Sequence, residues 1–326
     1  MEASVIIPTY NRAEQLRNCL QALACQTYPA IDFEAVVVVD GSTDGTTEML
    51  ASLKTPFTLR VISQPNTGQP SALNRGLAIS TGHVSIFLDD DIVVEAQFIS
   101  EHMRLHQEHK LVVGVGQIKL ELRTDADWFA HGFASGWRNH YEELNRGQRP
   151  PEWDECYGGN MSVPRAAVLA VGGNVTDLRR GFDVDLAYRL KRYGCSLVYL
   201  PQALGNQQQN KGFQELCRDS ELAGEGSVEL VRRHPQMETK LLGHIMQTGW
   251  TWLLFWQLLF LTNISAGGIN RLQKLMDRGK SYKWFVFIDH YYFWRGVRRA
   301  LQRNDLNPVS SNLSISRKFR RGRLER

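Results

Sequence analysis

Apolar runs alternate with amphipathic segments along the first ninety residues of the chain. Continuous apolar runs that end in polar residues predict buried strands, and apolar residues three or four positions apart predict helices. The predicted strands cover residues 3–10, 33–40, 57–63 and 83–90. The segments between them predict helices within residues 11–26, 41–54 and 68–80, with Asn11 and Asp44 as N-caps of the first two. This alternation predicts an α/β fold with an open, mostly parallel sheet flanked by helices.

Polar side chains lie at or just after the end of each predicted strand. Ligands of open α/β sheets bind beyond the carboxyl ends of the strands, so these side chains are expected at one edge of the sheet. In chain order they are Thr9 and Tyr10, Asp40, Asn66 and Gly68, and Asp89, Asp90 and Asp91.

The stretch Asp89–Asp91 places three carboxylates in a row, which repel one another and need a counter-charge. Mg²⁺ and Mn²⁺ prefer oxygen ligands, and Mg²⁺ often binds one or two carboxylates together with substrate phosphates. The stretch therefore predicts a metal–diphosphate site. The alternative is that the aspartates only form a turn or cap the following helix. The chain has no G-x-G-x-x-G after the first strand and no G-x-x-x-x-G-K-[ST], which argues against a dinucleotide-binding domain and a P-loop NTPase.

The composition is that of a folded globular protein, with 326 residues of which 43% are hydrophobic and 22% charged. Five scattered cysteines without a C-x-x-C pair argue against a disulfide framework or a zinc knuckle and indicate a reducing compartment. The first residues, MEASVIIPTYNR, show no basic leader and no long apolar region. No secretory signal is therefore expected, and a cytoplasmic location is predicted.

Four sequence blocks together carry a resemblance to a known family. They are SVIIPTYNR, VVVVDGSTDGT, NTGQPSALNRGLAISTGHVSIFLDDD, and GGNMSVPRAAVLAVGG followed by GFDVDLAYRLKRYG. In this order and spacing they resemble the family 2 glycosyltransferases, which have the GT-A fold of nucleotide-diphospho-sugar transferases. The resemblance implies an inverting transferase that moves a sugar from a nucleotide-diphosphate sugar to an acceptor hydroxyl.

The resemblance implies a binding site for the nucleotide-sugar donor. Its P-T-Y-N and D-G-S blocks correspond to the residues that hold the base and ribose in the family. An aspartate that accepts the N3–H of uracil or thymine implies a UDP- or dTDP-linked donor, and Asp40 is the aspartate expected to do so, unless it only caps the following turn. The predicted donor-binding residues are Pro8, Thr9, Tyr10, Asp40, Asn66 and Asp89.

The D-x-D motif of the family corresponds to Asp89 and Asp91. Asp91 is expected to bind the Mg²⁺ or Mn²⁺ ion directly, with Asp89 on the ribose or on a metal-bound water. The ion would stabilise the charge that develops on the leaving nucleotide. Asp90 occupies the variable position of the motif and is expected to be solvated. Relatives often complete the metal shell with a histidine, and here Asn206 or Gln207 stands where that histidine is expected.

The resemblance implies that Asp183 is the general base, because an acceptor hydroxyl needs a base to attack the anomeric carbon. The family has a Glu-Asp pair at the start of a helix, and in this chain Phe182 replaces the glutamate. The alternative role of Asp183 is an N-cap, and Asp185 is expected to be a first-turn anion on the helix dipole. The segment Gly158–Asn160 is either part of the donor and acceptor site or a tight turn.

The carboxy-terminal region differs in composition from the rest. Residues 271–326 contain fifteen Lys or Arg and four Asp or Glu, although the whole chain carries a formal charge of only +4. Residues 241–270 contain no Asp, Glu, Lys or Arg, although they include His244, and they are rich in Trp and Leu. Aromatic and basic residues together predict attachment to an anionic membrane surface, the alternatives being a helical packing layer or a membrane span. Nucleic acid is not expected as a partner.

These observations predict three regions: a GT-A catalytic domain over residues 1–215, a helical extension over 216–305, and a basic tail over 306–326. The expected acceptor is a saccharide or lipid-linked saccharide at the inner face of the cell membrane, in the synthesis of surface polysaccharide or glycolipid. The alternative is a catalytically degenerate relative that binds nucleotide sugar or membrane without turnover. A nucleotidyltransferase is disfavoured because the chain has no Gly-rich, Lys-bearing triphosphate loop.

Overall fold

The structure is a computed structural model that describes residues 1–147, 149–242 and 282–303. The chain divides into two compact units. Unit 1 consists of residues 1–123, 136–178 and 182–209, and unit 2 comprises residues 124–135, 179–181 and those from 210 onward.

Only one boundary of the predicted three regions lies within the described residues. The boundary expected between residues 215 and 216 falls inside helix α8 (Phe213–Arg233). Most of the uncharged segment 241–270 and the whole tail 306–326 lie outside the described residues. The three-region division therefore stays a prediction.

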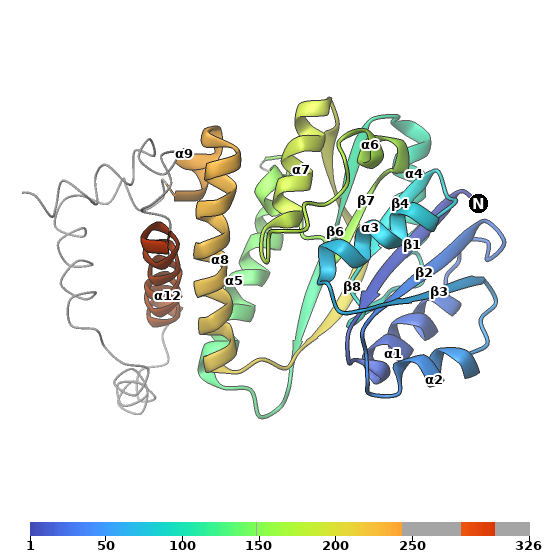
Figure 1. Cartoon of the computed structure of the whole chain (residues 1–326), viewed down its shortest axis with the longest axis horizontal. Helices are drawn as coiled ribbons and strands as arrows, with labels where there is room; N and C mark the ends of the chain where they lie inside the picture. The colour runs from blue at the N-terminus through green and yellow to red at the C-terminus, as the bar shows by residue number, and fades with distance from the viewer. Residues whose placement is uncertain (148, 243–281, 304–326) are drawn as a thin grey trace, which may run out of the picture. The chain divides into compact units, whose positions relative to one another are not determined.

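Unit 1 is built on one eight-stranded sheet with the strand order β3-β2-β1-β4-β7-β6-β8-β5 (Figure 1). Its strands are β1 (Ala3–Thr9), β2 (Phe33–Asp40), β3 (Thr58–Gln64), β4 (Val84–Leu88), β5 (Ile92–Val94), β6 (Val112–Leu122), β7 (Asn160–Pro164) and β8 (Ser196–Gln209). The four amino-terminal strands are mutually parallel, as the sequence predicts. Strand β7 runs antiparallel to β4 and β6, β8 runs parallel to β6, and β5 runs antiparallel to β8. The predicted α/β fold with a flanked sheet is confirmed.

Helices cover both faces of the sheet. The helices that contribute to unit 1 are α1 (Ala13–Ala24), α2 (Thr46–Ser52), α3 (Gln69–Ile79), α4 (Phe98–Glu108), part of α5 (Trp128–Asn145), the 3₁₀ turn η1 (Trp153–Glu155), α6 (Arg165–Ala170) and α7 (Phe182–Tyr193). Leu16 and Leu20 of α1 belong to one buried cluster with Val5 and Ile7 of β1. On the other face, a Cβ atom on Gly76 of α3 would lie 2.5 Å from Cγ2 of Ile6. Alternate residues of a strand point to opposite faces, and since helices cover both faces, β1 and β2 are buried throughout.

The amino terminus of α1 is capped from another loop, so the prediction of Asn11 as its N-cap is wrong. Asn11 has a left-handed backbone (φ 52°), and its Oδ1 accepts the Thr43 N–H at 2.7 Å. The Ala13 N–H donates instead to Oδ2 of Asp44 at 3.0 Å, and Oδ1 of Asp44 accepts the Thr46 N–H of α2. One carboxylate thus serves the first turns of two helices, because the parallel strands β1 and β2 bring their following loops together.

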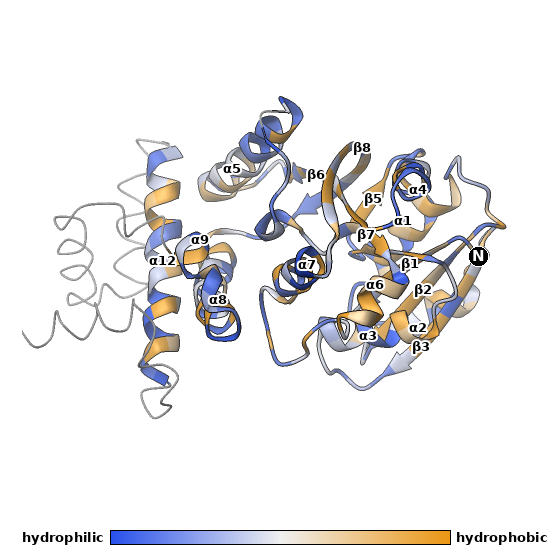
Figure 2. Cartoon of the chain, turned by 90° about the horizontal axis from the view of Figure 1, so that it is seen from above, coloured by the Kyte–Doolittle hydropathy of each residue, from blue (hydrophilic) through white to orange (hydrophobic). Residues whose placement is uncertain are grey.

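Unit 2 contains a closely packed pair of helices, α8 and α12 (Tyr282–Arg303). The unit also includes η2 (Pro235–Met237) and α9 (Glu238–Leu242). A Cβ atom on Gly224 or Gly296 would lie 1.9 Å from a backbone oxygen of the other helix, so only glycine allows this approach. Figure 2 shows apolar and polar bands alternating along α12. Within the described residues, no helix is both long and apolar enough to cross a membrane.

Two histidines of α4, the buried His102 and the partly buried His106, connect this helix to β7. His102 Nδ1 and His106 Nε2 lie 2.8 and 2.9 Å from the Ser162 hydroxyl, and His102 Nε2 lies 2.9 Å from Oδ1 of Asn160. Burial lowers the pKa of His102 to about 3 and that of His106 to about 4. Both side chains are therefore neutral in the folded protein at neutral pH.

These histidines predict a loss of stability in mild acid. The unfolded chain takes up a proton on each histidine below its ordinary pKa of 6.5, whereas the folded chain does not. The free energy of unfolding should therefore fall as the pH drops below 6.5, by up to about 1.4 kcal/mol per pH unit for each histidine. Urea unfolding at several pH values between about 7.5 and about 5 measures this slope, because the range includes the ordinary histidine pKa of about 6.5.

The variant His102→Gln should make the slope shallower by the contribution of one proton, although it is less stable at every pH. His83→Gln, a change at an exposed histidine, is the control and should leave the slope of the parent protein. An unaltered slope in His102→Gln would show that His102 takes up no additional proton on unfolding, which contradicts its lowered pKa.

Candidate active site

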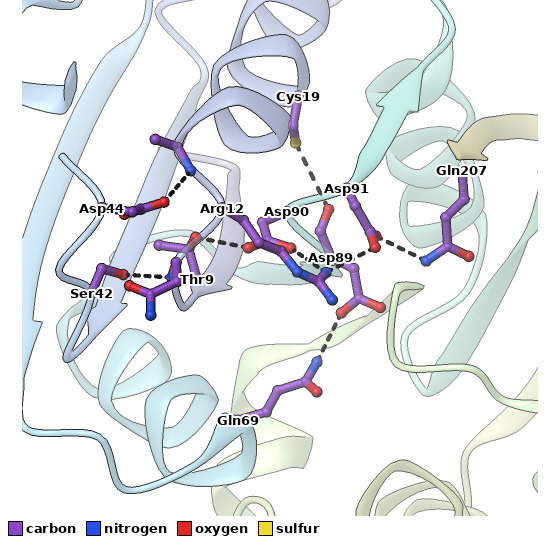
Figure 3. A network of polar contacts seen from close by, with 12 residues as sticks. Thr9, Arg12, Cys19, Ser42, Asp44, Gln69, Asp89, Asp90, Asp91 and Gln207 are labelled. Atoms are coloured by element: carbon purple, nitrogen blue, oxygen red, sulfur yellow. Dashed lines mark hydrogen bonds and ion pairs between the residues drawn. The ribbon is translucent and has the colours of Figure 1, made fainter. Parts of the chain in front are cut away.

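The three aspartates after β4 each have a partner from a different part of unit 1 (Figure 3). Asp90 is buried, with 4% of its surface exposed. Its Oδ2 accepts the Thr9 hydroxyl at 2.7 Å, and its Oδ1 accepts Nη1 of Arg12 at 3.0 Å. The prediction that Asp90 is solvated is therefore wrong. Two consecutive residues cannot both face the open edge here, and Asp90 turns inward toward the end of β1.

Asp91 is held by two side chains from opposite directions. Its Oδ2 accepts Nη1 of Arg12 at 2.8 Å, and its Oδ1 accepts Nε2 of Gln207 at 2.8 Å. The sequence left two candidates for the position of the family's histidine. The structure brings Gln207 to Asp91, because β8 pairs with β5, the strand that directly follows the acidic stretch. Asn206 instead donates to Oε1 of Glu95.

Asp89 faces the turn that precedes β7. Its Oδ1 accepts Nε2 of Gln69 at 2.8 Å, and its backbone N–H donates to the Gly159 oxygen at 3.2 Å. Burial, followed by the charges of Asp91 and Asp90, raises the pKa of Asp89 to about 7. Burial disfavours the charged form of Asp89, and the two neighbouring carboxylates add to this effect.

Asp183 lies in the first turn of α7, as the sequence predicts. Its Oδ2 accepts the Gly158 N–H at 3.1 Å. Gly158 and Gly159 are consecutive, so one turn of backbone contacts both Asp183 and Asp89. Cβ atoms on these glycines would lie 3.2 Å from Cβ of Asp183 and 2.6 Å from Oδ2 of Asp89. The turn brings together the two carboxylates that the sequence assigned to separate tasks.

The residues around Asp183 have structural contacts. Asp185 is buried and pairs with Arg189 at 2.6 Å, and Arg189 also donates to the backbone oxygens of Val171 and Gly173. Asp185 therefore fixes the loop before α7, in addition to its expected place in the first turn. Phe182, which replaces the expected glutamate, is buried with 8% of its surface exposed. Of the segment Gly158–Asn160, the two glycines lie at the carboxylates, whereas the Asn160 side chain is buried and donates to the oxygens of Ala203 and Gln117.

The predicted base-binding end of the site lies after β2 and β3. Asp40 is buried and holds the loop that follows β3. Its Oδ1 accepts Nε2 of Gln64 at 2.8 Å and the Thr67 N–H at 2.9 Å, and its Oδ2 accepts the Gly68 N–H at 2.8 Å. Of the other predicted donor residues, Pro8 is buried, and Tyr10 and Asn66 are exposed. The Thr9 hydroxyl is committed to Asp90.

The oxygen ligands that Asp89 and Asp91 offer fit a divalent cation that also binds a substrate. Within residues 1–147, 149–242 and 282–303, no group of three or more His, Cys, Asp or Glu side chains is arranged to hold a metal ion by itself. Two carboxylates and the Gln207 amide match the incomplete protein shell that Mg²⁺ uses when phosphate oxygens supply the remaining ligands. A side chain on Gly159 would occupy the space beside Oδ2 of Asp89, because its Cβ would lie 2.6 Å from this oxygen.

Sequence reasoning missed two residues of the site, Arg12 and Gln69. A cation directly after the first strand, on the edge that receives three aspartates, is a signal of charge complementarity that points to Arg12. Gln69 gives no such signal, because an amide at the start of a helix is common on protein surfaces.

Comparisons with known proteins give the family of this chain. Residues 4–172 match the family described as Glycosyl transferase family 2. The validoxylamine A glucosyltransferase of Streptomyces hygroscopicus subsp. jinggangensis (strain 5008) is 27% identical over 274 residues, and the match covers 76% of this chain and 64% of that protein.

Two solved structures share the fold at 18% and 16% sequence identity. The mannosyltransferase PcManGT of Pyrobaculum calidifontis, in complex with GDP-Man and Mn²⁺, matches with a TM-score of 0.68 over 92% of this chain and 87% of that chain. S. aureus TarS 1–349 in complex with UDP-GlcNAc matches with a TM-score of 0.57 over 99% and 92%. The match to the family extends over more than half of the sequence, so this chain belongs to glycosyltransferase family 2.

Proposed function

We propose that this protein transfers a sugar from a pyrimidine nucleotide-diphosphate donor to an acceptor hydroxyl, with inversion of the anomeric centre. Asp183 is the general base in this proposal, and Asp89 and Asp91 hold Mg²⁺ or Mn²⁺ against the donor diphosphate. The acceptor is a saccharide or a lipid-linked saccharide at a membrane surface, as in surface polysaccharide or glycolipid synthesis.

The observation that carries the proposal is the double contact of the Gly158–Gly159 turn. One glycine binds the carboxylate at the start of α7, and the next contacts the carboxylate after β4. A transferase needs a base on one side of the anomeric carbon and stabilisation of the leaving group on the other. A fixed backbone turn keeps these two carboxylates at a constant separation, which supports their use in one reaction.

Asp183 is positioned by the backbone on both sides of its carboxylate. Its Oδ2 accepts the Gly158 N–H and its Oδ1 accepts the Val184 N–H, which orients the side chain at the start of α7. One positioned carboxylate and direct displacement give inversion, whereas retention needs a second nucleophile.

Asp89, Asp91 and the Gln207 amide are the side chains that would hold the divalent ion. When bound, the ion stabilises the negative charge that develops on the leaving nucleoside diphosphate. Gln69 orients Asp89, and Gln207 orients Asp91, so both carboxylates are positioned before the donor binds.

Asp40 supports a pyrimidine base in the donor. Its Oδ2 accepts only the Gly68 N–H among the contacts of the described residues, and an oxygen with a remaining lone pair can accept the N3–H of uracil or thymine. The solved structures of similar fold were obtained with GDP-Man in one case and with UDP-GlcNAc in the other. The nucleotide preference therefore has to be measured on this protein itself.

A degenerate relative that binds donor without turnover is the rival proposal. It is motivated by Phe182 in place of the glutamate of the family and by Gln207 in place of the histidine. The rival predicts nucleotide-sugar binding without release of the nucleoside diphosphate.

Substitutions of Asp183 and Asp91 distinguish the role of the general base from that of the metal ligand. Asp183→Asn should lower the rate of UDP release from the preferred UDP-sugar by a factor of about 100 or more, because general-base catalysis typically contributes that much. It should leave Mn²⁺ and UDP affinity within about threefold of the parent, a difference below 1 kcal/mol. Asp91→Asn should weaken Mn²⁺ binding as well as turnover.

A coupled assay for UDP release and calorimetry with UDP and Mn²⁺ give both readouts. Glu108→Gln, an exposed carboxylate of α4, is the matched control and should behave as the parent. Turnover that survives Asp183→Asn undiminished contradicts the base assignment, and binding without turnover in the parent supports the rival.

Not all basic residues of the carboxy-terminal region support the proposed attachment to a membrane surface. Arg295 and Arg299 of α12 pair with the buried Glu221 of α8 at 2.6 and 2.8 Å, and Arg303 pairs with Glu225 at 3.2 Å. These three cations stabilise the helix pair, so they do not add free charge for lipid headgroups. Basic residues outside the described ranges, those within 271–280 and those of the tail 306–326, remain candidates for contact with anionic lipid.

The full chain should therefore float with phosphatidylcholine vesicles that contain phosphatidylglycerol and sediment without them, and added salt should release it. The double change Lys318→Glu and Arg320→Glu should weaken flotation. Arg17→Glu, on an exposed face of α1, should not. Equal binding to neutral vesicles would contradict an electrostatic attachment.

A further inference from the structure

Arg12 lies between two of the aspartates and has no role in the reaction as described so far. It occupies the N-cap position of α1 (φ −143°, ψ 46°), three residues after the end of β1. One nitrogen, Nη1, donates to Asp90 at 3.0 Å and to Asp91 at 2.8 Å. Figure 3 shows the guanidinium reaching across the end of β1 to the acidic stretch.

The two carboxylates that Arg12 contacts differ in their environment. Asp90 is buried and its other oxygen is bound by the Thr9 hydroxyl, so Asp90 is unavailable to a ligand from solvent. The Asp91 side chain is three times more exposed, at 18% against 6% for the side chain of Asp90. Arg12 therefore has one permanent partner and one partner on the open side of the site.

Both oxygens of Asp91 accept a donor from the protein in this state, one from Arg12 and one from Gln207. A cation that binds Asp91 has to displace one of these donors or share its oxygen with it. Displacement of the guanidinium costs an ion pair, while an uncharged amide gives way more easily or offers its own oxygen. Arg12 thus opposes the binding of a bare cation at Asp91.

We propose that Arg12 is an exchangeable counter-cation of Asp91, a positioning residue that couples metal binding to donor binding. This inference rests on the proposed function, in which Asp91 binds the divalent ion. With the site empty, Arg12 balances the acidic stretch and disfavours the bare ion. A nucleoside diphosphate offers new acceptor oxygens to the guanidinium, which has five N–H donors, and Arg12 remains anchored by Asp90 when it releases Asp91.

The proposal predicts that loss of the positive charge improves the binding of the ion alone. Arg12→Gln should bind Mn²⁺ without nucleotide about two- to fivefold more tightly than the parent, the scale expected for the loss of one partly exposed ion pair. UDP should then enhance Mn²⁺ affinity less than it does in the parent. Titration of free Mn²⁺ by electron paramagnetic resonance, with and without UDP, measures both affinities and does not depend on turnover.

A purely structural role of Arg12 predicts the opposite result. It would weaken or leave unchanged the Mn²⁺ affinity of Arg12→Gln, and either outcome overturns the proposal. Arg17→Gln, an exposed arginine of the same helix, is the matched control and should keep the parent affinity and the parent effect of UDP. Circular dichroism verifies that each variant is folded before the titration.

If Arg12→Gln does not fold, Arg12→Met provides the test. Its unbranched side chain also removes the positive charge, so tighter binding of Mn²⁺ alone supports the proposal and equal or weaker binding overturns it. Asp91→Asn separates this inference from the proposed function. Mn²⁺ binding that survives Asp91→Asn refutes the metal site itself, whereas loss of binding there together with an unchanged Arg12→Gln refutes only the role of Arg12.

Discussion

The electrostatic balance of three consecutive carboxylates is the constraint on which the site depends. Each aspartate after β4 is balanced by a donor from a different element, and Arg12 bridges two of them. The uncharged donors come from β1, α3 and β8, and they are Thr9, Gln69 and Gln207. The acidic stretch can keep its shape only when these elements are in place, so the geometry of the site is a property of the whole sheet. Parallel strands β1 and β4 supply one side of it, and the crossover that brings β8 beside β6 and β5 supplies the other.

The turn before β7 adds a steric constraint to this electrostatic one. Gly158 and Gly159 let the backbone touch two carboxylates from separate elements, and a side chain on Gly159 would enter the space of Asp89 Oδ2. Backbone contacts of this kind fix a separation more firmly than long side chains do, because no rotamer has to be frozen. The link from sequence to chemistry therefore includes residues that carry no chemical group at all.

The sequence was informative where a residue's role follows from its position along one element. Asp183 at the start of a helix, the parallel amino-terminal strands and the polar strand ends are all of this kind, because they follow from hydrophobic periodicity and from motifs. It was uninformative where the partner comes from elsewhere in the chain. Asp44, and not the expected Asn11, caps the first turn of α1. Asp90 binds the Thr9 hydroxyl at the end of β1. No local pattern encodes which of three adjacent side chains turns inward, since that depends on the strand packed beside it.

Asp40, the residue proposed to bind the donor base, also has a structural role. Its bonds to Gln64, Thr67 and Gly68 tie the loop after β3 to the end of β2, and this loop leads directly into α3. Gln69, the first residue of α3, in turn holds Asp89. A change at Asp40 therefore reaches the acidic stretch through a chain of contacts, even though no ligand is involved. The loss of donor binding in an Asp40 variant is consequently no evidence for base recognition by itself, and only a changed preference between nucleotides would separate a contact with the base from the support of the loop.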